Sequence, residues 1–152
     1  MKYVECHADR CDFQLACMAT CAKKVQKSGD LALSNIVITK KDDGAIDMNV
    51  CNQCGACIDV CPTGAIYRNN VGVVRIDEEK CVGCYICVGF CPTGSMRAHE
   101  SRKAPFKCIS CGSCVKACPN RALLHVEGEF EPSYTEKNEP GEPGKTFPKE
   151  YF

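Results

Sequence analysis

The sequence predicts an α+β fold in which short helices and β-hairpins surround cysteine-rich loops. The 16 cysteines of this 152-residue chain fall into four groups of four, and three of these groups share one spacing that ends in proline. Between and after the groups, short runs rich in β-branched residues flank asparagine, aspartate and glycine, which is typical of hairpins. Only 7% of the residues are aromatic, so we expect bound groups to stabilise the fold more than a large apolar core does.

The three regular groups have the spacing C-x2-C-x2-C-x3-C-P, a bacterial iron–sulfur pattern in which three thiolates bind one cubane and the fourth reaches another. Their cysteines are Cys51, Cys54, Cys57 and Cys61; Cys81, Cys84, Cys87 and Cys91; and Cys108, Cys111, Cys114 and Cys118. Glycines at Gly55, Gly83 and Gly112 give each loop the backbone freedom to fold around a cluster. The third and fourth cysteines are four residues apart, so we expect one helical turn to carry both before proline ends it.

The first group is irregular. It contains Cys6, Cys11, Cys17 and Cys21. The last three keep the spacing of a regular first, third and fourth cysteine, but Gln14 stands at the second position. We predict that Cys6 supplies the missing thiolate, with His7 as the alternative because imidazole replaces thiolate in some clusters. The following proline is replaced by Ala22, so the helix is expected to continue to Lys27.

Two other uses of cysteine fit the spacing less well. A disulfide framework requires secretion, and residues 1–5 lack a basic segment followed by an apolar one, so we expect no secretion signal. Structural zinc sites separate their C-x2-C pairs by a dozen or more residues, whereas a third cysteine here follows after two. We therefore predict four [4Fe–4S] clusters as the cofactors.

The remaining elements follow in chain order. We predict a helix over residues 16–27 closed at 28–29, a strand over 35–39 and a turn at 42–44. A hairpin is expected from 65–67 and 73–76, between two regular groups, and a last strand over 122–126. We divide the chain into an inner module at 51–96, an outer module split between 1–50 and 97–127, and a Pro/Glu/aromatic arm at 128–152 that lies against the chain's own body or a partner.

Charge and hydropathy exclude several functions. The formal net charge is zero, but sixteen thiolates around four dipositive cubanes would leave roughly −8. Lysine and arginine occur as scattered doublets and form no stripe, which argues against nucleic-acid binding. No apolar run approaches the roughly 18 residues that span a bilayer, so we expect no direct membrane insertion. Because oxidation damages exposed clusters, we expect a reducing cytoplasm.

The pair of regular groups around a hairpin at 51–96 resembles a two-cluster bacterial ferredoxin. Residues 6–126 as a whole resemble the four-cluster iron–sulfur subunits of molybdenum or tungsten oxidoreductases, formate hydrogenlyases and carbon monoxide dehydrogenases. The short loops and small size are most similar to the small subunit of tungsten-dependent aldehyde oxidoreductases. This resemblance implies tandem bacterial ferredoxin-like (4Fe-4S) modules, one inserted within the other.

The resemblance also implies a ligand pairing, in which cysteines are exchanged between groups. The four implied sets are Cys6, Cys11, Cys17 and Cys118; Cys51, Cys54, Cys57 and Cys91; Cys81, Cys84, Cys87 and Cys61; and Cys108, Cys111, Cys114 and Cys21. If all sixteen cysteines are ligands, every iron has its thiolate and no open coordination site remains, so we predict no catalytic residues.

The implied function is that of a non-catalytic electron-transfer subunit. It would relay electrons between a large catalytic subunit with a tungsten or molybdenum cofactor and an acceptor, either ferredoxin or a flavin/NAD subunit. The alternatives are a free-standing polyferredoxin, an electron-transfer subunit of a hydrogenase, formate dehydrogenase or carbon monoxide dehydrogenase, and an enzyme that acts at an open iron.

Overall fold

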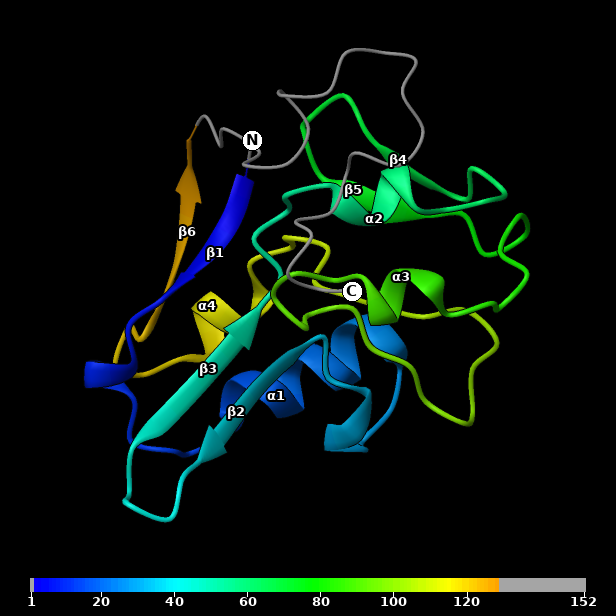
Figure 1. The fold of residues 1–152 in the computed structure, drawn as a ribbon. Coiled ribbons are helices and arrows are strands. Elements are labelled where there is room, and N and C mark those ends of the chain that lie inside the picture. The colour runs from blue at the N-terminus through cyan, green and yellow to red at the C-terminus, as the bar shows by residue number, and fades with distance from the viewer. Residues whose placement is uncertain (1, 129–152) are drawn as a thin grey trace.

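Three two-stranded antiparallel sheets and a series of short helices make up the fold (Figure 1). The computed structural model describes residues 2–128, so the predicted arm at 128–152 lies outside the described residues except for Gly128. The elements are β1 (Lys2–Cys6), η1 (Ala8–Arg10), α1 (Ala16–Cys21), η2 (Ala22–Gln26), η3 (Leu31–Leu33), β2 (Ile36–Lys40), β3 (Ile46–Val50), α2 (Ala56–Asp59), β4 (Ile66–Arg68), β5 (Val74–Ile76), α3 (Ile86–Gly89), α4 (Ser113–Ala117) and β6 (Leu123–Glu127).

The first and last strands pair with each other, although more than 110 residues separate them in the chain. In Figure 1, β1 in blue lies beside β6 in orange, and the register joins Lys2 to Glu127 and Cys6 to Leu123. The strand predicted at 122–126 is confirmed with a shift of one residue. The sequence did not indicate β1, because Val4 is its only buried residue and gives too little alternation to mark a strand.

The predicted hairpin from 65–67 and 73–76 is confirmed, and the strand predicted over 35–39 also belongs to a hairpin. Strands β2 and β3 pair across the turn at 42–44, where Gly44 has a φ of 85° and the Asp43 carboxylate accepts a hydrogen bond from the Ala45 N–H at 2.9 Å. Strands β4 and β5 pair over three residues, Ile66–Arg68 with Val74–Ile76.

The helix predicted over 16–27 is observed as α1 followed directly by η2, a π-helical turn. The backbone therefore continues past Ala22, as its replacement of proline predicts. The end differs from the expectation, because Lys27 and not the 28–29 pair reverses the chain, with a φ of 55°. The Ser28 N–H then donates to the Ala22 carbonyl at 3.2 Å and closes the helix.

The regular groups depart from the prediction in one respect. Their third cysteines lie on α2, α3 and α4, but their fourth cysteines Cys61, Cys91 and Cys118 lie beyond the helix ends. The expectation that one helical turn carries both is therefore wrong for these groups. Proline disfavours the helical conformation for the residue before it, and Cys118 is accordingly extended, with φ −83° and ψ 113°. Only in α1, which no proline follows, are Cys17 and Cys21 both helical.

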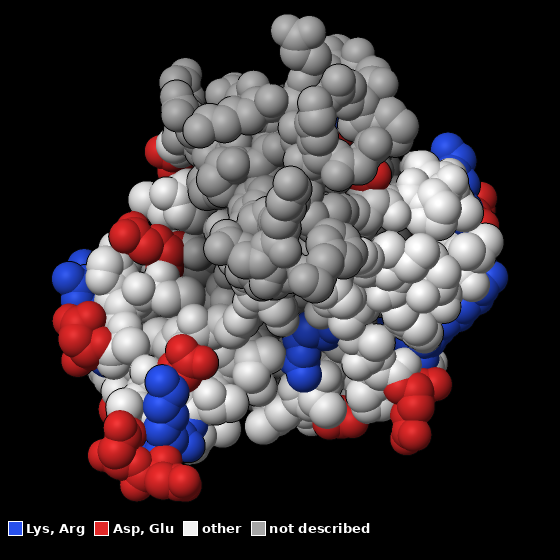
Figure 2. Space-filling view, in the orientation of Figure 1, with Lys and Arg blue, Asp and Glu red and all other residues white. Residues whose placement is uncertain are grey.

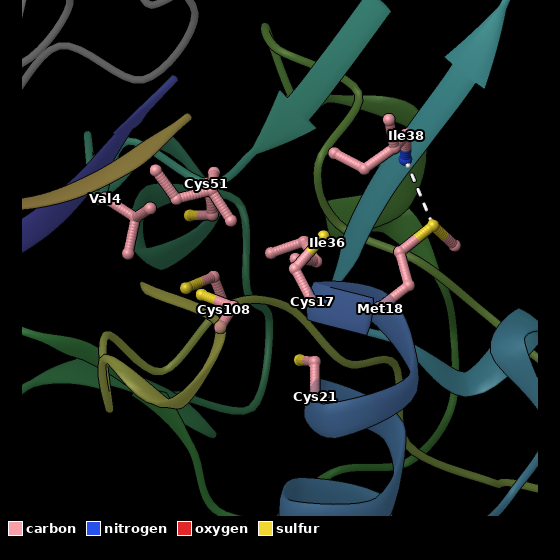
Figure 3. Packing of buried hydrophobic residues seen from close by; sticks show 10 residues of the cluster. Val4, Cys17, Met18, Cys21, Ile36, Ile38, Cys51 and Cys108 are labelled. Carbon is pink, nitrogen blue, oxygen red and sulfur yellow. Dashed lines mark hydrogen bonds between the residues drawn. The ribbon is translucent and has the colours of Figure 1, made fainter. Parts of the chain in front are cut away.

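Two clusters of buried side chains form the interior, and cysteines take part in both. The larger cluster joins β1, α1, β2, α4 and β6, and Figure 3 shows Cys17, Cys21, Cys51 and Cys108 among its aliphatic side chains. In the same view the Ile38 N–H donates to the Met18 sulfur at 3.3 Å. The smaller cluster packs Ile66, Val74 and Met96 around two further cysteines. Seven of the cysteines in residues 2–128 are thus buried, whereas Cys84 and Cys111 are exposed.

The surface carries both signs of charge. On the face shown in Figure 2, Lys and Arg alternate with Asp and Glu. No helix formed by residues 2–128 is both long and apolar enough to span a lipid bilayer.

Candidate iron–sulfur sites

All four cysteine groups have the same loop backbone. The residue before and the residue after the second position each have positive φ. Those before it are Phe13, Gln53, Gly83 and Ser110, with φ of 63°, 65°, 73° and 53°; those after it are Leu15, Gly55, Tyr85 and Gly112, with φ of 59°, 94°, 57° and 73°. The irregular first group therefore folds like the others, and exposed Gln14 occupies the place of their second cysteine. Non-glycine residues pay a steric cost in this conformation, so the loops are held by their surroundings.

The Cys51 set, defined as Cys51, Cys54, Cys57 and Cys91, draws on two groups. The pKa of Cys57 is raised to about 12, mainly by burial, which Lys107 opposes and to which the charges of Cys51, Cys54 and Cys91 add. Burial likewise raises the pKa of Cys51, and the charges of Cys54 and Cys91 also raise this pKa. The charge of Cys91, the fourth cysteine of its own group, therefore acts on thiols of the preceding group.

The reverse exchange forms the Cys81 set, defined as Cys81, Cys84, Cys87 and Cys61. Burial raises the pKa of Cys87 to about 11, and the charges of Cys84, Cys61 and Cys81 add to the rise. Cys87 is the only buried member, whereas Cys84 is exposed. The Cys81 set is thus the more open of the two.

The Cys108 set, defined as Cys108, Cys111, Cys114 and Cys21, joins α1 to α4. Burial raises the pKa of Cys114 to about 12, and the charges of Cys108, Cys21 and Cys111 raise it further. Three of these cysteines are buried and Cys111 is exposed.

The Cys6 set, defined as Cys6, Cys11, Cys17 and Cys118, is brought together by β1 and β6. The pKa of Cys6 is raised to about 11, mainly by burial and further by the charges of Cys17, Glu5 and Cys11. Burial also raises the pKa of Cys17, to which Cys118 and Cys11 contribute. The structure thus brings Cys6 to the other thiols of its group.

His7, the alternative to Cys6, follows it directly. Its Nε2 is buried and has no hydrogen-bond partner among the described residues, while its backbone N–H donates to the Ala122 carbonyl at 2.8 Å. Both candidates therefore lie at the same end of β1.

Neighbouring sets also act on each other. Besides burial, Cys51 contributes to the raised pKa of Cys108, and Cys17 contributes to that of Cys114. The Cys51 set and the Cys81 set are joined by their exchanged cysteines. These charge interactions favour the order Cys81, Cys51, Cys108 and Cys6 for the four sets.

The donor chemistry fits [4Fe–4S] clusters. Each set consists of thiols, and backbone N–H groups donate to several of their sulfurs, which is one means of tuning a cluster. These bonds run from Gln53 to Cys51 at 3.4 Å, from Ser110 to Cys108 at 3.3 Å and from Ala122 to Cys118 at 3.3 Å. Within residues 2–128, no three Cys, His, Asp or Glu side chains converge on a single metal ion. A cubane instead takes one thiolate at each of its four irons.

Threonines beside two of the exchanged cysteines act against burial. The Thr63 and Thr93 hydroxyls lie 3.7 and 3.6 Å from the sulfurs of Cys61 and Cys91. Burial acts to raise the pKa of both thiols, but these hydroxyls and nearby backbone N–H groups lower it overall. The two exchanged positions thus favour the thiolate form that iron binds.

Two residues near the sites were missed by the sequence interpretation. Lys107 is 3% exposed, and its Nζ donates to the Gln53 side-chain carbonyl and to the Cys108 carbonyl, both at 3.0 Å. Gln53 is fully buried, donates from Nε2 to the Cys108 carbonyl at 2.9 Å and accepts from the Val74 N–H at 3.0 Å. The only sequence signal for Lys107 is a lysine within the mostly apolar run at 104–109.

The family comparisons agree with the cysteine chemistry. Two family models, each described as a 4Fe-4S dicluster domain, match residues 50–95 and 73–119. Residues 50–119 of the chain are thus similar to 4Fe-4S dicluster domains. The matched residues contain the three regular groups, and electron transport by 4Fe-4S clusters is the function that these domains indicate.

The curated relatives that this chain matches are named as ferredoxins or as ferredoxin-like. It is 48% identical over 40 residues to the probable ferredoxin TA0517 of Thermoplasma acidophilum, which covers 26% of this chain and 56% of the relative. It is 32% identical over 89 residues to the ferredoxin-like protein YdhX of Escherichia coli, covering 53% of this chain and 40% of that one. A probable ferredoxin of Methanosarcina thermophila is 37% identical over 35 residues, 23% of this chain and 60% of the relative. The chain thus spans about half the length of the curated relatives it matches.

The solved structures that are similar to this chain include the active site complex BamBC of benzoyl coenzyme A reductase. In the complex with 1,5-dienoyl-CoA, the similarity covers 91% of this chain and 83% of the matched chain, with 19% identity and a TM-score of 0.49. In the complex with zinc, the similarity covers 86% of this chain and 81% of the matched chain, with 21% identity and a TM-score of 0.48.

Proposed function

We propose that this protein is a non-catalytic electron-transfer subunit with four [4Fe–4S] clusters, one in each of the Cys81, Cys51, Cys108 and Cys6 sets. The observations that support the proposal are the sixteen cysteines in four groups of four and the charge interactions that couple thiols of different groups, as between Cys57 and Cys91 and between Cys87 and Cys61. When bound, each cluster accepts and releases a single electron. All-cysteine ligation leaves no open iron, which favours electron transfer over catalysis.

The order of the sets supports a relay along one line. The Cys51 and Cys108 sets stand in the middle and hold two and three buried cysteines, respectively. The two end sets, named for Cys81 and Cys6, hold one buried cysteine each. An electron would enter at one end and leave at the other, while burial keeps water away from the two middle sites.

The protein's own residues set the conditions for transfer. The exchanged cysteines follow the short helices α2, α3 and α4 closely or, for Cys21, lie on α1, which would limit movement of neighbouring sites relative to each other. Backbone N–H groups and threonine hydroxyls that donate to sulfur favour the more negative, reduced state of the bound group. Side chains from both core clusters pack around the thiols and lower the local dielectric.

We further propose a large catalytic oxidoreductase subunit as the partner, with a tungsten aldehyde oxidoreductase as the first candidate and a molybdenum enzyme, hydrogenase, formate dehydrogenase or carbon monoxide dehydrogenase as others. This rests on the resemblance of residues 6–126 to four-cluster subunits. The second candidate is a free-standing polyferredoxin, which the names of two curated relatives favour.

Purification of the native protein under anaerobic conditions tests the proposal. We expect a large subunit to co-purify in equal amount, to be identified by mass spectrometry, and to contain tungsten or molybdenum. Isolation of the chain alone, with clusters that ferredoxin-dependent enzymes reduce and oxidise, would instead establish the free carrier. A chain that turns over a substrate by itself would contradict both.

A further inference from the structure

Lys107 is a buried cation whose partners are all neutral. Both atoms that accept from its Nζ are carbonyl oxygens, and among residues 2–128 no Asp or Glu forms an ion pair with it. Lys107 and Glu78 both line a cavity of about 200 Å³, but Glu78 forms its ion pair with Arg102. A buried ammonium without an opposite charge is strongly unfavourable, because the interior does not replace its hydration. Its position therefore indicates a nearby negative charge that no carboxylate of residues 2–128 supplies.

The charge of Lys107 acts on thiols of the two middle sets. Lys107 directly precedes Cys108, and its charge counteracts the burial that raises the pKa of Cys51, Cys57 and Cys108. It thus lies where the Cys51 set and the Cys108 set adjoin. Each oxidised [4Fe–4S] cluster with four thiolates carries a charge of about −2, so two anionic groups would flank the ammonium.

Gln53 holds Lys107 in this position. Its side-chain oxygen accepts from Lys107, and its nitrogen donates to the carbonyl of Cys108, so the amide joins the loops of two cysteine groups. The same residue donates its backbone N–H to the Cys51 sulfur. The ammonium is therefore fixed relative to both middle sets by buried hydrogen bonds and does not swing into solvent.

We propose that Lys107 is the counter-charge of the two middle clusters and raises their reduction potentials relative to those of the two end clusters. This inference rests on the proposed four-cluster function. A cluster becomes more negative when it is reduced, and a fixed cation nearby stabilises the reduced state. Because the site is buried, water and salt screen this attraction little. Electrons would then reside preferentially in the middle of the relay.

The test compares reduction potentials by EPR-monitored titration in three variants of the full chain. Lys107→Gln removes the charge and retains a hydrogen-bond donor, whereas Lys107→Arg retains the charge. Lys116→Gln is the matched control, because Lys116 is an exposed lysine within the Cys108 group. In Lys107→Gln we expect the reduction equilibrium of two clusters to shift at least tenfold toward the oxidised state, a fall of about 59 mV for one electron. The potentials of the other two clusters should not change in Lys107→Gln. In Lys107→Arg and in Lys116→Gln, all four potentials should stay near those of the wild type.

Each other outcome decides the question. Unchanged potentials in Lys107→Gln, or an equal shift of all four, would overturn the proposal. If Lys107→Gln does not assemble its clusters, normal iron content and potentials in Lys107→Arg would support a requirement for charge. Failure of both variants would overturn it, since shape and not charge would then be what the site requires. A wild-type protein without four reversible one-electron centres would instead refute the proposed function itself.

Discussion

Gln53 offers a demanding test of how the two middle sets are held together. Replacing it with alanine removes a buried amide that bonds to three groups: the Val74 N–H, the Lys107 ammonium and the Cys108 carbonyl. The carbonyl keeps its bond to Lys107, but the Val74 N–H loses its acceptor and the ammonium loses one of two. Glutamine and alanine both carry a Cβ, so the strain of the positive φ at residue 53 is nearly the same in the variant.

The magnitude follows from these losses. An unsatisfied buried N–H costs about 1–3 kcal/mol, and a lost hydrogen bond to a charged group about 1.5–3 kcal/mol. Gln53→Ala should therefore destabilise the protein by about 2.5–6 kcal/mol, a large part of the stability of a typical domain. If half of the lower figure appears in the unfolding barrier, the clusters are released roughly eightfold faster.

The assay is the rate at which cluster absorbance disappears at a fixed elevated temperature without oxygen, because unfolding of a protein that loses its clusters is not reversible. Gln14→Ala is the control, since Gln14 is exposed in the corresponding loop of the first group and its replacement should change the stability by less than about 0.5 kcal/mol. A Gln53→Ala rate within twofold of wild type would refute the reasoning, because the hydrogen bonds would then not hold the two loops together.

Three further changes test separate parts of the structure. Cys6→Ser should lower the iron content by one cluster, from about sixteen to about twelve atoms per chain, while His7→Ala should keep it; the reverse pattern would make histidine the ligand. Gly83→Ala should destabilise the protein more than Gly64→Ala in thermal melts, because both have positive φ but only at Gly83 would the new Cβ meet a backbone oxygen at 2.9 Å; equal effects would contradict this contact. Leu123→Ala, at a fully buried side chain, should cost about 2–5 kcal/mol, and a melting temperature within about 2 °C of wild type would be inconsistent with its place in the core.

Local patterns made much of the fold predictable. The hairpin of β4 and β5, strand β2, the last strand and the helix that begins at Ala16 each follow from residues adjacent in the chain, and the structure has them within a residue or two. The fourth cysteines were placed wrongly because helical spacing was weighed without the restriction that proline imposes on the residue before it. The conformation of Cys118 shows which effect prevails.

Contacts between distant residues were the part that the sequence did not reveal. Strand β1 is recognisable only by its pairing with β6, and nothing near Gln53 indicates that it meets Lys107, 54 residues later. The positive φ of Phe13 and Leu15 was also hidden, because neither residue type favours it. That backbone nevertheless makes the first group resemble the other three, despite Gln14.

The iron and acid-labile sulfide content of the anaerobically purified full chain tests the central claim most directly. Four [4Fe–4S] clusters predict about sixteen iron atoms and about sixteen sulfides per chain. A content near eight of each, or zinc in place of iron, would contradict the account of four cysteine sets that each bind one cluster.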